Sequence, residues 1–471
     1  MEKTVSIIGG GLAGSEAALQ LAAQGIPVTL YEMRPVHQTD VHKTGYLAEL
    51  VCSNSLKSTK PETAAGMQKR ELELLGSKLF AEALKAQVPA GGALAVDRDA
   101  FARAVTSLVE NDPLIDLRHE EVCSIEEVSE TSLAIVLATG PLTSDALAES
   151  LMRYVGGTSL AFYDAAAPIV MADSLDRDIL FRQSRYEDAV GSDGSAQGDY
   201  LNAPFTKDEY ERFIDELLAA ERVIKRDFES KDLFQACQPI EEIARAGRDA
   251  PRFGPLKPVG LTDPRTGKRP WAALQLRAED AIGACYNLVG FQTNLKFSEQ
   301  KRVFSLIPGL ENAEFARFGV MHRNTFIDAP RVLDSCLRVR TPEADELGVP
   351  LFVAGQLGGT EGYCEAIRSG LHVALSVTAL IRDIPLPVPP PTTAFGSLLA
   401  YATDPGTEEY QPMHVNFGVL PPLDKPPRNK RDRYAAYAAR GEEALLGYCA
   451  ELASCGLLGH APDAAHAHLG A

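Results

Sequence analysis

The sequence predicts an α/β fold in which a parallel-sheet domain is interrupted by a large inserted α+β domain. Three observations carry this prediction. A glycine-rich turn at 9–14 follows a short apolar run and opens a helical pattern, and a second glycine cluster at 354–363 follows another apolar run far downstream. Between them, beyond Gly157, the chain becomes richer in aromatic residues and glycine-rich loops. The two clusters predict two halves of one site, and the change in amino-acid composition predicts the insertion.

The first glycine cluster has the context of a dinucleotide fingerprint. Gly9 allows a tight turn, Gly11 lets the backbone approach a pyrophosphate, and Gly14 permits close packing of helix on strand. The helix N-terminus offers unpaired N–H groups and positive partial charge to the phosphates. A second predicted strand, 26–31, ends on Glu32, whose carboxylate can accept from a ribose 2′-hydroxyl and would repel a 2′-phosphate. A glycine-rich turn without a ligand is the alternative, but strand, spacing and acid together favour the dinucleotide site.

The second glycine cluster predicts that the dinucleotide is a flavin. Two glycine-rich halves joined in one fold are typical of a Rossmann-like FAD-binding domain of the glutathione-reductase type. The buried strand predicted at 133–138 ends on Thr139 and Gly140, an ending that in large flavoproteins typically passes close to the cofactor. Gly140 is therefore a predicted contact. Tyr363 could stack on a ring system, and a core tyrosine is the alternative.

Length and composition exclude several classes of protein. The chain has 471 residues, of which 45% are apolar, and this predicts two or three globular domains. The apolar run before the first glycines is too short for a signal peptide, and no stretch is expected to reach the about 18 apolar residues of a membrane span. We therefore expect a cytoplasmic protein without membrane contact. Eight cysteines without paired C-x-x-C spacing argue against a metal site and a disulfide framework.

Composition shifts divide the chain into three parts. Residues 1–157 and 319–400 are expected to form a discontinuous FAD-binding domain, and residues 158–318 the inserted substrate domain. A proline-rich connector at 385–391 cannot be a helix or a central strand. Beyond it we expect a helical C-terminal segment at 401–471 with a disordered tail. The sequence carries no signal for an oligomeric state.

Two basic segments interrupt an otherwise acidic chain. The formal charge of −18 argues against nucleic-acid binding by net charge, because neutralising phosphates needs local Lys and Arg. The second segment interleaves Tyr434 and Tyr437 with its cations, a mixture that can hold a nucleic-acid backbone and stack a base. For either segment alone, a solvated basic face is the favoured alternative. The cations are Arg245, Arg248, Arg252, Lys257, Arg265, Lys268 and Arg269 in the first segment, and Lys425, Arg428, Lys430, Arg431, Arg433 and Arg440 in the second.

Two of the cysteines stand in settings suited to chemistry. Cys237 precedes Pro239, which suits the first turn of a helix, so the thiol is expected at or just before a helix N-terminus. That position and nearby arginines favour a thiolate, whereas the acidic residues at 241–242 oppose it. Cys52 precedes Ser and Asn at 53–54, either of which could cap a following helical turn. From these residues alone, inert burial is the favoured alternative for any cysteine.

The chain also contains six long and specific sequence motifs, at 50–56, 89–98, 138–144, 254–261, 307–313 and 319–325. Together they resemble the folate- and flavin-dependent tRNA (uracil-5-)-methyltransferase (TrmFO) family, and the resemblance covers nearly the whole chain. It implies a non-covalent FAD that is reduced by NADH or NADPH, and tRNA as the partner of the inserted domain. It further implies that 5,10-methylenetetrahydrofolate, rather than S-adenosylmethionine, supplies the carbon of 5-methyluridine at position 54 of the T-loop.

The resemblance also assigns roles to residues. Uracil C5 becomes a carbon nucleophile only after a group adds to C6, and a thiolate suits that reversible addition. Cys237 matches the family's nucleophile. The C5 proton must then be removed by a base within hydrogen-bond reach, and Cys52 matches the second thiol for which that role is proposed. The cofactor contacts carried over are Gly9, Gly10, Gly11, Leu12, Ala13, Gly14 and Glu32 for the ADP half, and Gly355, Gln356, Glu361, Gly362 and Tyr363 for the flavin half.

The chain departs from the family pattern at several positions. Ala203 stands where the family usually has a cysteine, and Asn294 where it usually has a histidine, which puts a folate or RNA contact by that side chain in doubt. Residues 365–368 replace Glu-Ser-Ala-Ala, and Arg368 adds a charge without an evident partner. The alternatives are uracil-C5 methylation of ribosomal RNA, wobble-uridine modification of tRNA by a related flavoprotein, a non-catalytic flavin-binding RNA-interaction module, and a small-molecule flavin oxidoreductase.

Overall fold

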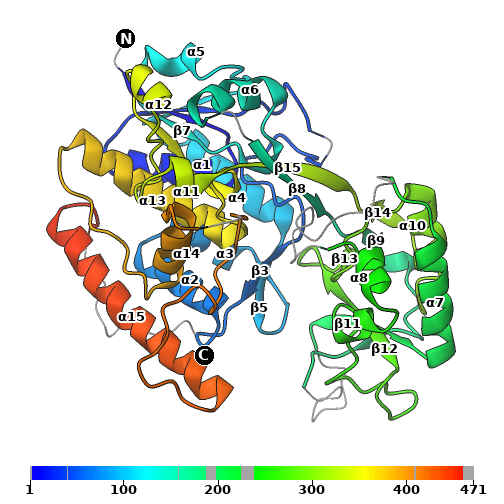
Figure 1. The fold of residues 1–471 in the computed structure, drawn as a ribbon. Coiled ribbons are helices and arrows are strands. Elements are labelled where there is room, and N and C mark those ends of the chain that lie inside the picture. Colours follow the sequence, from blue (N-terminus) through cyan, green and yellow to red (C-terminus); the bar gives the residue numbers. More distant parts are fainter. Residues whose placement is uncertain are drawn as a thin grey trace.

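The computed structural model describes residues 3–39, 41–156, 159–186, 198–223, 238–407 and 410–459, without the side chains of 159–165 and 321–325. These residues form two lobes, and the antiparallel pair β8 (Ser159–Ala165) and β15 (Met321–Ile327) runs between them (Figure 1). The chain leaves the first lobe through β8 and returns to it through β15.

The first lobe is built on a five-stranded parallel sheet with the order β16-β7-β1-β2-β6. The apolar runs of the sequence form its centre, and the predicted Rossmann-like α/β class is confirmed. Strand β1 lies between β2 and β7, with Ile7 opposite Leu30 and Val136. The strands are β1 (Thr4–Ile8), β2 (Val28–Tyr31), β6 (Ile115–Arg118), β7 (Ser132–Leu137) and β16 (Leu351–Val353).

Two helices that lie far apart in the sequence pack tightly against each other beside this sheet. Helix α1 (Leu12–Ala23) lies against α13 (Tyr363–Ile381), and the approach depends on glycine: a Cβ at Gly370 would lie 2.2 Å from the Ala13 carbonyl oxygen. Helix α13 has the length and apolar composition of a membrane span, so the expectation that no stretch has them was wrong. Within the protein 83% of that apolar window is buried, and α13 serves as a core helix.

A small three-stranded sheet and several helices complete the first lobe. The sheet order is β3-β5-β4. Helix α4 carries a side-chain cap from Asp97, which accepts from the Ala100 N–H. The elements are β3 (Ser55–Ser58), β4 (Gln87–Val88), β5 (Ala93–Val96), α2 (Ala64–Leu74), α3 (Lys78–Lys85), α4 (Arg98–Glu110) and α6 (Asp145–Tyr154).

The second lobe is a six-stranded antiparallel sheet with the order β10-β11-β12-β13-β9-β14 and helices packed on it (Figure 1). Its separate apolar core includes a run of ring contacts from Phe205 through Phe213 and Phe291 to Phe304. The elements are β9 (Ile169–Met171), β10 (Phe181–Arg182), β11 (Tyr200–Phe205), β12 (Ala272–Ala278), β13 (Cys285–Leu288), β14 (Phe315–Arg317), α7 (Lys207–Ala219), α8 (Ile240–Ala246), α9 (Ala250–Phe253) and α10 (Phe297–Phe304).

The C-terminal helices pack on the first lobe, away from the insertion (Figure 1). Helix α14 (Ala394–Thr403) follows the proline-rich connector, and α15 (Lys430–Ser454) lies along α2. One apolar cluster joins Leu74 of α2, Leu371 of α13 and Leu445 of α15. The C-terminal segment therefore stabilises the lobe that carries the two glycine clusters.

Candidate functional site

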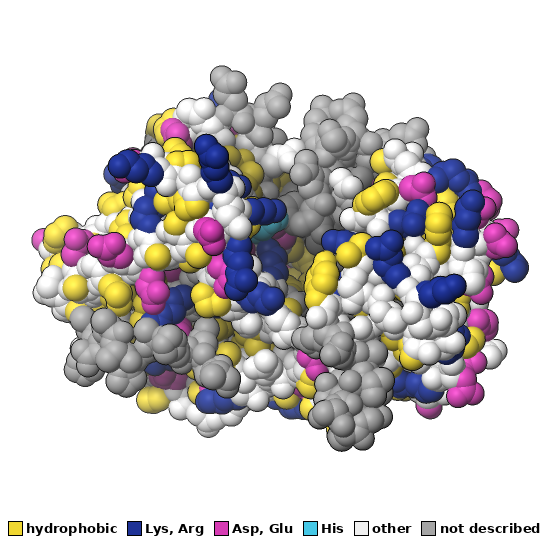
Figure 2. Space-filling view, turned by 90° about the horizontal axis from the view of Figure 1, so that it is seen from below, with side chains coloured by type: hydrophobic (Ala, Val, Ile, Leu, Met, Phe, Trp, Pro, Cys, Tyr) yellow, Lys and Arg dark blue, Asp and Glu magenta, His cyan; other side chains and the backbone are white. Residues whose placement is uncertain are grey.

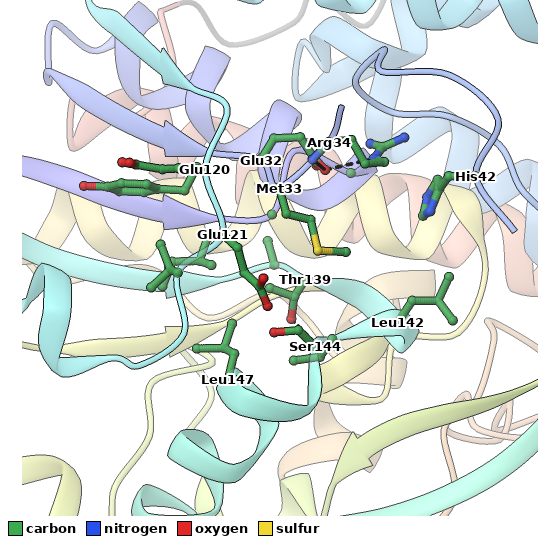
Figure 3. Close-up of a pocket in the computed structure, with 17 residues that line it drawn as sticks. Glu32, Met33, Arg34, His42, Glu120, Glu121, Thr139, Leu142, Ser144 and Leu147 are labelled. Carbon is green, nitrogen blue, oxygen red and sulfur yellow. Dashed lines mark hydrogen bonds and ion pairs between the residues drawn. The ribbon is translucent and has the colours of Figure 1, made fainter. Parts of the chain in front are cut away.

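The turn between β1 and α1 forms one wall of a cavity (Figure 3). Gly9 has φ +105°, and a Cβ there would lie 2.6 Å from the Ala138 carbonyl oxygen, so only glycine fits. Gly11 is the N-cap of α1 and provides no side-chain cap, which leaves the first N–H groups of the helix available to a ligand. The cavity is lined by Ile8, Gly9, Gly11, Tyr31, Glu32, Met33, Arg34, His42, Glu120, Glu121, Val122, Ala138, Thr139, Leu142, Thr143, Ser144 and Leu147.

Gly11→Val is expected to weaken FAD binding at least about tenfold while the protein stays folded. Gly11 has φ −73° with extended ψ, and no atom lies within 4 Å of a Cβ built there, so the valine side chain would enter the cavity rather than the core. It would block the backbone approach that a pyrophosphate needs. Flavin titration by fluorescence measures the affinity, and thermal unfolding of the apoprotein checks the fold. Gly14→Ala is the contrasting variant, because its Cβ would lie 1.9 Å from the Gly9 carbonyl oxygen and should destabilise the fold itself.

Glu32 is held as a carboxylate at the cavity wall (Figure 3). Its Oε2 accepts from the Gly10 N–H at 2.9 Å, and its Oε1 accepts from the Arg34 N–H at 3.0 Å and from Arg34 Nε at 2.8 Å. Burial alone would raise the pKa of this carboxyl, but the hydrogen bonds and charge of Arg34 outweigh it and lower the pKa. An ionised acid at this point suits a ribose hydroxyl.

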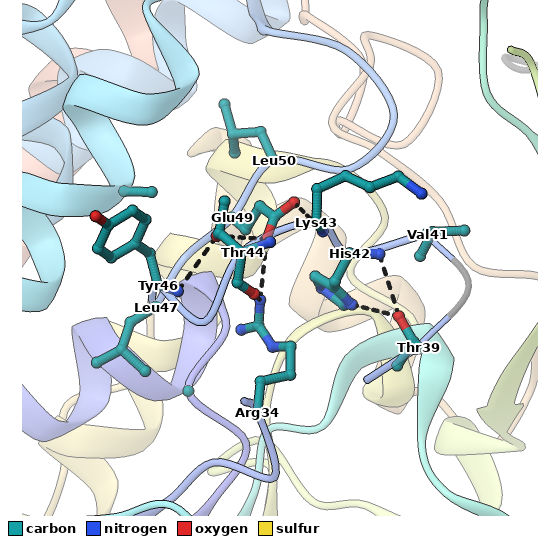
Figure 4. Close-up of polar contacts among 12 residues, drawn as sticks. Arg34, Thr39, Val41, His42, Lys43, Thr44, Tyr46, Leu47, Glu49 and Leu50 are labelled. Carbon is teal, nitrogen blue, oxygen red and sulfur yellow. Dashed lines mark hydrogen bonds and ion pairs between the residues drawn. The ribbon is translucent and has the colours of Figure 1, made fainter. Parts of the chain in front are cut away.

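A polar loop after Glu32, which the sequence reasoning missed, contributes Arg34 and His42 to the cavity lining, and its polar contacts are drawn in Figure 4. Arg34 Nη1 binds Glu49 Oε2 at 3.2 Å, and Glu49 also accepts from the N–H and the hydroxyl of Thr44. His42 lines the cavity, and burial together with the charge of Arg34 lowers its pKa to about 4. At neutral pH it is therefore an uncharged ring facing the ligand space. The only sequence signal was the density of polar residues after the second strand.

The second glycine cluster forms a short 3-10 helix, η5 (Gly355–Gly358), next to α1. Gly355 has φ +75°, and a Cβ there would lie 3.1 Å from the Ala13 Cβ. Its N–H donates to Ser369 Oγ at 2.7 Å. Gln356 Nε2 and Thr360 Oγ1 are buried and have no hydrogen-bond partner among the described residues, which leaves a donor and a hydroxyl for a polar ligand. Together with the open turn at Gly11, these groups fit the flavin that the sequence predicts.

Tyr363, at the end of the second glycine cluster, is hydrogen-bonded to the backbone at Cys52. Its hydroxyl accepts from the N–H of Cys52 at 3.0 Å and from the N–H of Ser53 at 3.1 Å, across more than 300 positions of sequence. The predicted helical turn after Cys52 is wrong, because Ser55 begins strand β3 and pairs with Ala95. The backbone donors near this thiol therefore serve the tyrosine rather than a helix start. Burial raises the pKa of the Tyr363 phenol, so its hydroxyl stays protonated.

The inserted lobe meets the Cys52 strand through buried polar contacts. Arg277, near the end of β12, donates from Nε to Asn54 Oδ1 at 2.8 Å and from Nη2 to Ser53 Oγ at 2.9 Å. Asn54 in turn donates to the carbonyls of Val96 and Ala278. An ion pair between Arg98 of the first lobe and Glu279 of the second lies beside these bonds. We call these residues the Cys52 junction, and it fixes this thiol between the flavin lobe and the insertion.

Cys237 lies outside the described residues, and only its flanks can be placed. On one side the Val223 N–H donates to the Asn294 carbonyl at 2.8 Å, and on the other the Ile240 N–H donates to the Gln292 carbonyl at 2.8 Å. Both flanks therefore border the same stretch of the inserted lobe. Asn294, the departure from the family pattern, is fully buried there, so this position does not present a side chain to solvent. The predicted helix is present as α8 and ends at Gly247, but Pro239 is its N-cap rather than a residue of its first turn.

Glu241→Gln is expected to stabilise the protein at pH 8 but not at pH 5. Burial raises the pKa of the Glu241 carboxyl from 4.5 to about 7, although Thr293 and the Asn294 N–H both hydrogen-bond to it. The folded state then holds the proton more tightly than the unfolded state, so stability is full below about pH 4.5 and is lost as the pH rises toward 7. We expect a gain of about 2–3 kcal/mol at pH 8 from the about 1.4 kcal/mol per pKa unit.

Urea unfolding at the two pH values measures this gain. The neighbouring Glu242→Gln is the matched control, because Glu242 is half-buried and binds Arg222 at 3.0 Å, and its loss should not stabilise the protein at pH 8. A Glu241→Gln variant that is equally destabilised at both pH values would contradict the assignment.

The two basic segments differ in how far their charges are paired. In the first, Arg248 binds Asp215 at 2.7 Å, Arg265 binds Asp263 at 2.9 Å, and Arg252 lies 3.7 Å above the Trp271 ring. In the second, none of the six cations makes an ion pair with a described residue, although Arg433 and Arg440 donate to backbone carbonyls. Figure 2 shows further Lys and Arg side chains on both walls of the hollow between the two lobes. An acidic chain thus keeps exposed positive charge.

A Rossmann-like sheet, a glycine turn on a cavity, a second glycine cluster beside the first helix and an inserted antiparallel lobe define an FAD-type flavoprotein. Residues 4–385 match the family model described as glucose inhibited division protein A. Relatives named methylenetetrahydrofolate–tRNA-(uracil-5-)-methyltransferase TrmFO are 50% identical in Moorella thermoacetica (94% of this chain, 98% of the relative) and 51% identical in Geobacter sulfurreducens (93% and 97%). The chain belongs to this TrmFO family within the broader one.

A solved structure supports the fold independently. Glucose inhibited division protein A (GidA) of Aquifex aeolicus superposes with a TM-score of 0.66, covering 97% of this chain and 74% of its own, at 16% sequence identity. At that identity the likeness speaks for the fold alone.

Proposed function

We propose that this protein forms 5-methyluridine at position 54 in the T-loop of tRNA, with 5,10-methylenetetrahydrofolate as the carbon donor. The observation that carries the proposal is about 50% identity over nearly the full length of enzymes named for this reaction. The fit of the cavity to FAD supports it. NADH or NADPH is the proposed reductant.

Two thiols act at the uracil ring in this proposal, Cys237 as the nucleophile and Cys52 as the base. Addition of the Cys237 thiolate to C6 makes C5 nucleophilic, and C5 then takes up the one-carbon unit as the folate releases it. Cys52 removes the C5 proton, and elimination of Cys237 restores the C5–C6 double bond. FAD, when bound and reduced, supplies the hydride that brings the carbon to the methyl level. The two electrons come from the nicotinamide, so tetrahydrofolate leaves unoxidised.

The surroundings of Cys52 support its role as the base. The Cys52 junction holds the thiol between the flavin lobe and the inserted lobe, and Tyr363 binds the backbone N–H groups of Cys52 and Ser53. A base is effective only within hydrogen-bond reach of its proton, so a rigid backbone at this point has catalytic value. The cofactor roles proposed for Gly140, Glu361 and Gly362 rest on the family resemblance; Gly140 begins a short 3-10 helix after β7, and Gly362 is the N-cap of α13.

The direct test is nucleoside mass spectrometry after incubation of purified protein with tRNA, ribosomal RNA, NADH and methylene-labelled methylenetetrahydrofolate. We expect label in 5-methyluridine of tRNA and none from S-adenosylmethionine. Label confined to ribosomal RNA would favour that target instead. A product at the wobble uridine would favour the related modification, and NADH oxidation without any RNA product would favour a flavin-binding module or a small-molecule oxidoreductase.

A further inference from the structure

Three phenylalanine rings of the inserted lobe form one parallel stack, which we call the aromatic stack. The ring centroids of Phe297 and Phe318 are 4.9 Å apart with planes at 17°, and those of Phe318 and Phe315 are 5.0 Å apart with planes at 12°. The core pair Phe291 and Phe304, by contrast, meets at 63°. The three rings are therefore nearly parallel and evenly spaced, as successive stacked bases are.

The stack ends in a ring that the protein does not cover. Phe297, the first residue of α10, is 53% exposed, whereas Phe315 and Phe318 are half-buried. Because Phe318 covers one face of Phe297, the exposed area includes the opposite face. A large apolar ring left open at the end of an ordered stack offers a flat surface to another ring.

The aromatic stack lies between the flavin lobe and a residue that flanks the segment carrying Cys237. At one end Arg317, between Phe315 and Phe318 in sequence, donates to the Val41 carbonyl of the flavin lobe at 3.0 Å. At the other end, the N–H of Lys296, which precedes Phe297, donates to the Glu221 carbonyl at 3.0 Å. One flank of the segment that carries Cys237 thus borders the start of α10.

We propose that the aromatic stack is a subsite for an unpaired nucleobase next to the uridine that reacts. The proposal rests on the proposed function. A uridine can present C5 and C6 to two thiols only after it leaves its own stack, and its neighbour then loses a stacking partner. The open face of Phe297 replaces that partner. Stacking on an aromatic ring tolerates any base.

The test replaces the ring but keeps an apolar side chain. Phe297→Leu is expected to raise the Kd and the KM for tRNA about fivefold or more, to leave the KM for methylenetetrahydrofolate unchanged, and to retain bound FAD. Phe297→Tyr should restore tRNA affinity. The matched control is Phe253→Leu in α9, since Phe253 is also an exposed phenylalanine of the same lobe, at 82%.

A second readout does not depend on methylation. 2-Aminopurine placed beside position 54 of a T-arm RNA should lose fluorescence on binding the wild type and the Phe253→Leu variant, but not Phe297→Leu. Unchanged tRNA affinity and unchanged quenching in Phe297→Leu would overturn the proposal. A rise in the folate KM alone would also overturn it and would assign the stack to the folate rings. Failure of the wild type to methylate tRNA would refute the function, while the quenching still reports on the stack.

Discussion

Replacing Cys52 by alanine is expected to lower 5-methyluridine formation at least about a hundredfold, because a positioned general base contributes about 10²–10⁴ in rate. The bound FAD and its reduction by NADH should persist, since the cavity at Gly11 and Glu32 does not include this thiol. Single-turnover formation of labelled 5-methyluridine measures the loss. Flavin absorbance before and after NADH addition checks that the cofactor is still bound and reduced.

Two variants separate chemistry from structure in this experiment. Cys52→Ser keeps the shape and polarity of the side chain but is a far weaker acid, so it should be as inactive as alanine; recovery of activity by serine would indicate a structural role. Cys455→Ala is the matched control, because Cys455 is also half-buried in the first lobe but lies at the end of α15. Normal methylation by Cys52→Ala would remove this residue from the mechanism.

Replacing Arg368 by methionine is expected to lower the free energy of unfolding by about 3–5 kcal/mol at pH 7. The guanidinium and the Glu71 carboxylate are both buried, with Arg368 Nε 3.5 Å from Glu71 Oε2, and the guanidinium lies 4.3 Å from the Phe395 ring centroid. Methionine would leave the carboxylate buried without its counter-charge. Equilibrium unfolding in urea measures the change.

The pH dependence and a double variant test this explanation. Burial raises the pKa of Glu71 even though Arg368 opposes the rise, and loss of Arg368 should raise it further. The destabilisation should therefore shrink as the pH is lowered and Glu71 takes up a proton, and Glu71→Gln should restore much of the stability of Arg368→Met. Arg118→Met is the control, since Arg118 pairs with Asp116 at an exposed surface and should change stability by less than about 1 kcal/mol. An equal loss in both variants would contradict the buried pair.

The parts of the fold that local chemistry determines could be predicted from sequence. The strand, glycine turn and helix around Gly9 follow from apolar periodicity and from steric limits that only glycine meets, and Glu32 follows from its distance to that turn. The insertion follows from the separation of the two glycine clusters and from the change in composition beyond Gly157, whereas the strand order β16-β7-β1-β2-β6 was not predicted.

The contacts between distant segments could not be predicted. Tyr363 reaches the backbone of Cys52 only because α13 and β3 meet in the folded lobe, and no spacing in the sequence records this. The turn expected after Cys52 followed local preferences of Ser and Asn, but pairing of β3 with β5 overrides them. The partner of Arg368 likewise became evident only when α2 and α13 packed together.

The central claim is that a thiol of the inserted lobe adds to C6 of a tRNA uridine held against the flavin lobe at Cys52. The most direct measurement uses T-arm RNA with 5-fluorouridine at position 54, in which fluorine replaces the proton that Cys52 would remove and so traps the adduct. With methylenetetrahydrofolate and NADH present, mass spectrometry of the digested complex should find the nucleotide bound to the peptide that contains Cys237. An adduct on Cys52, or none with a protein that methylates normal tRNA, would contradict the claim.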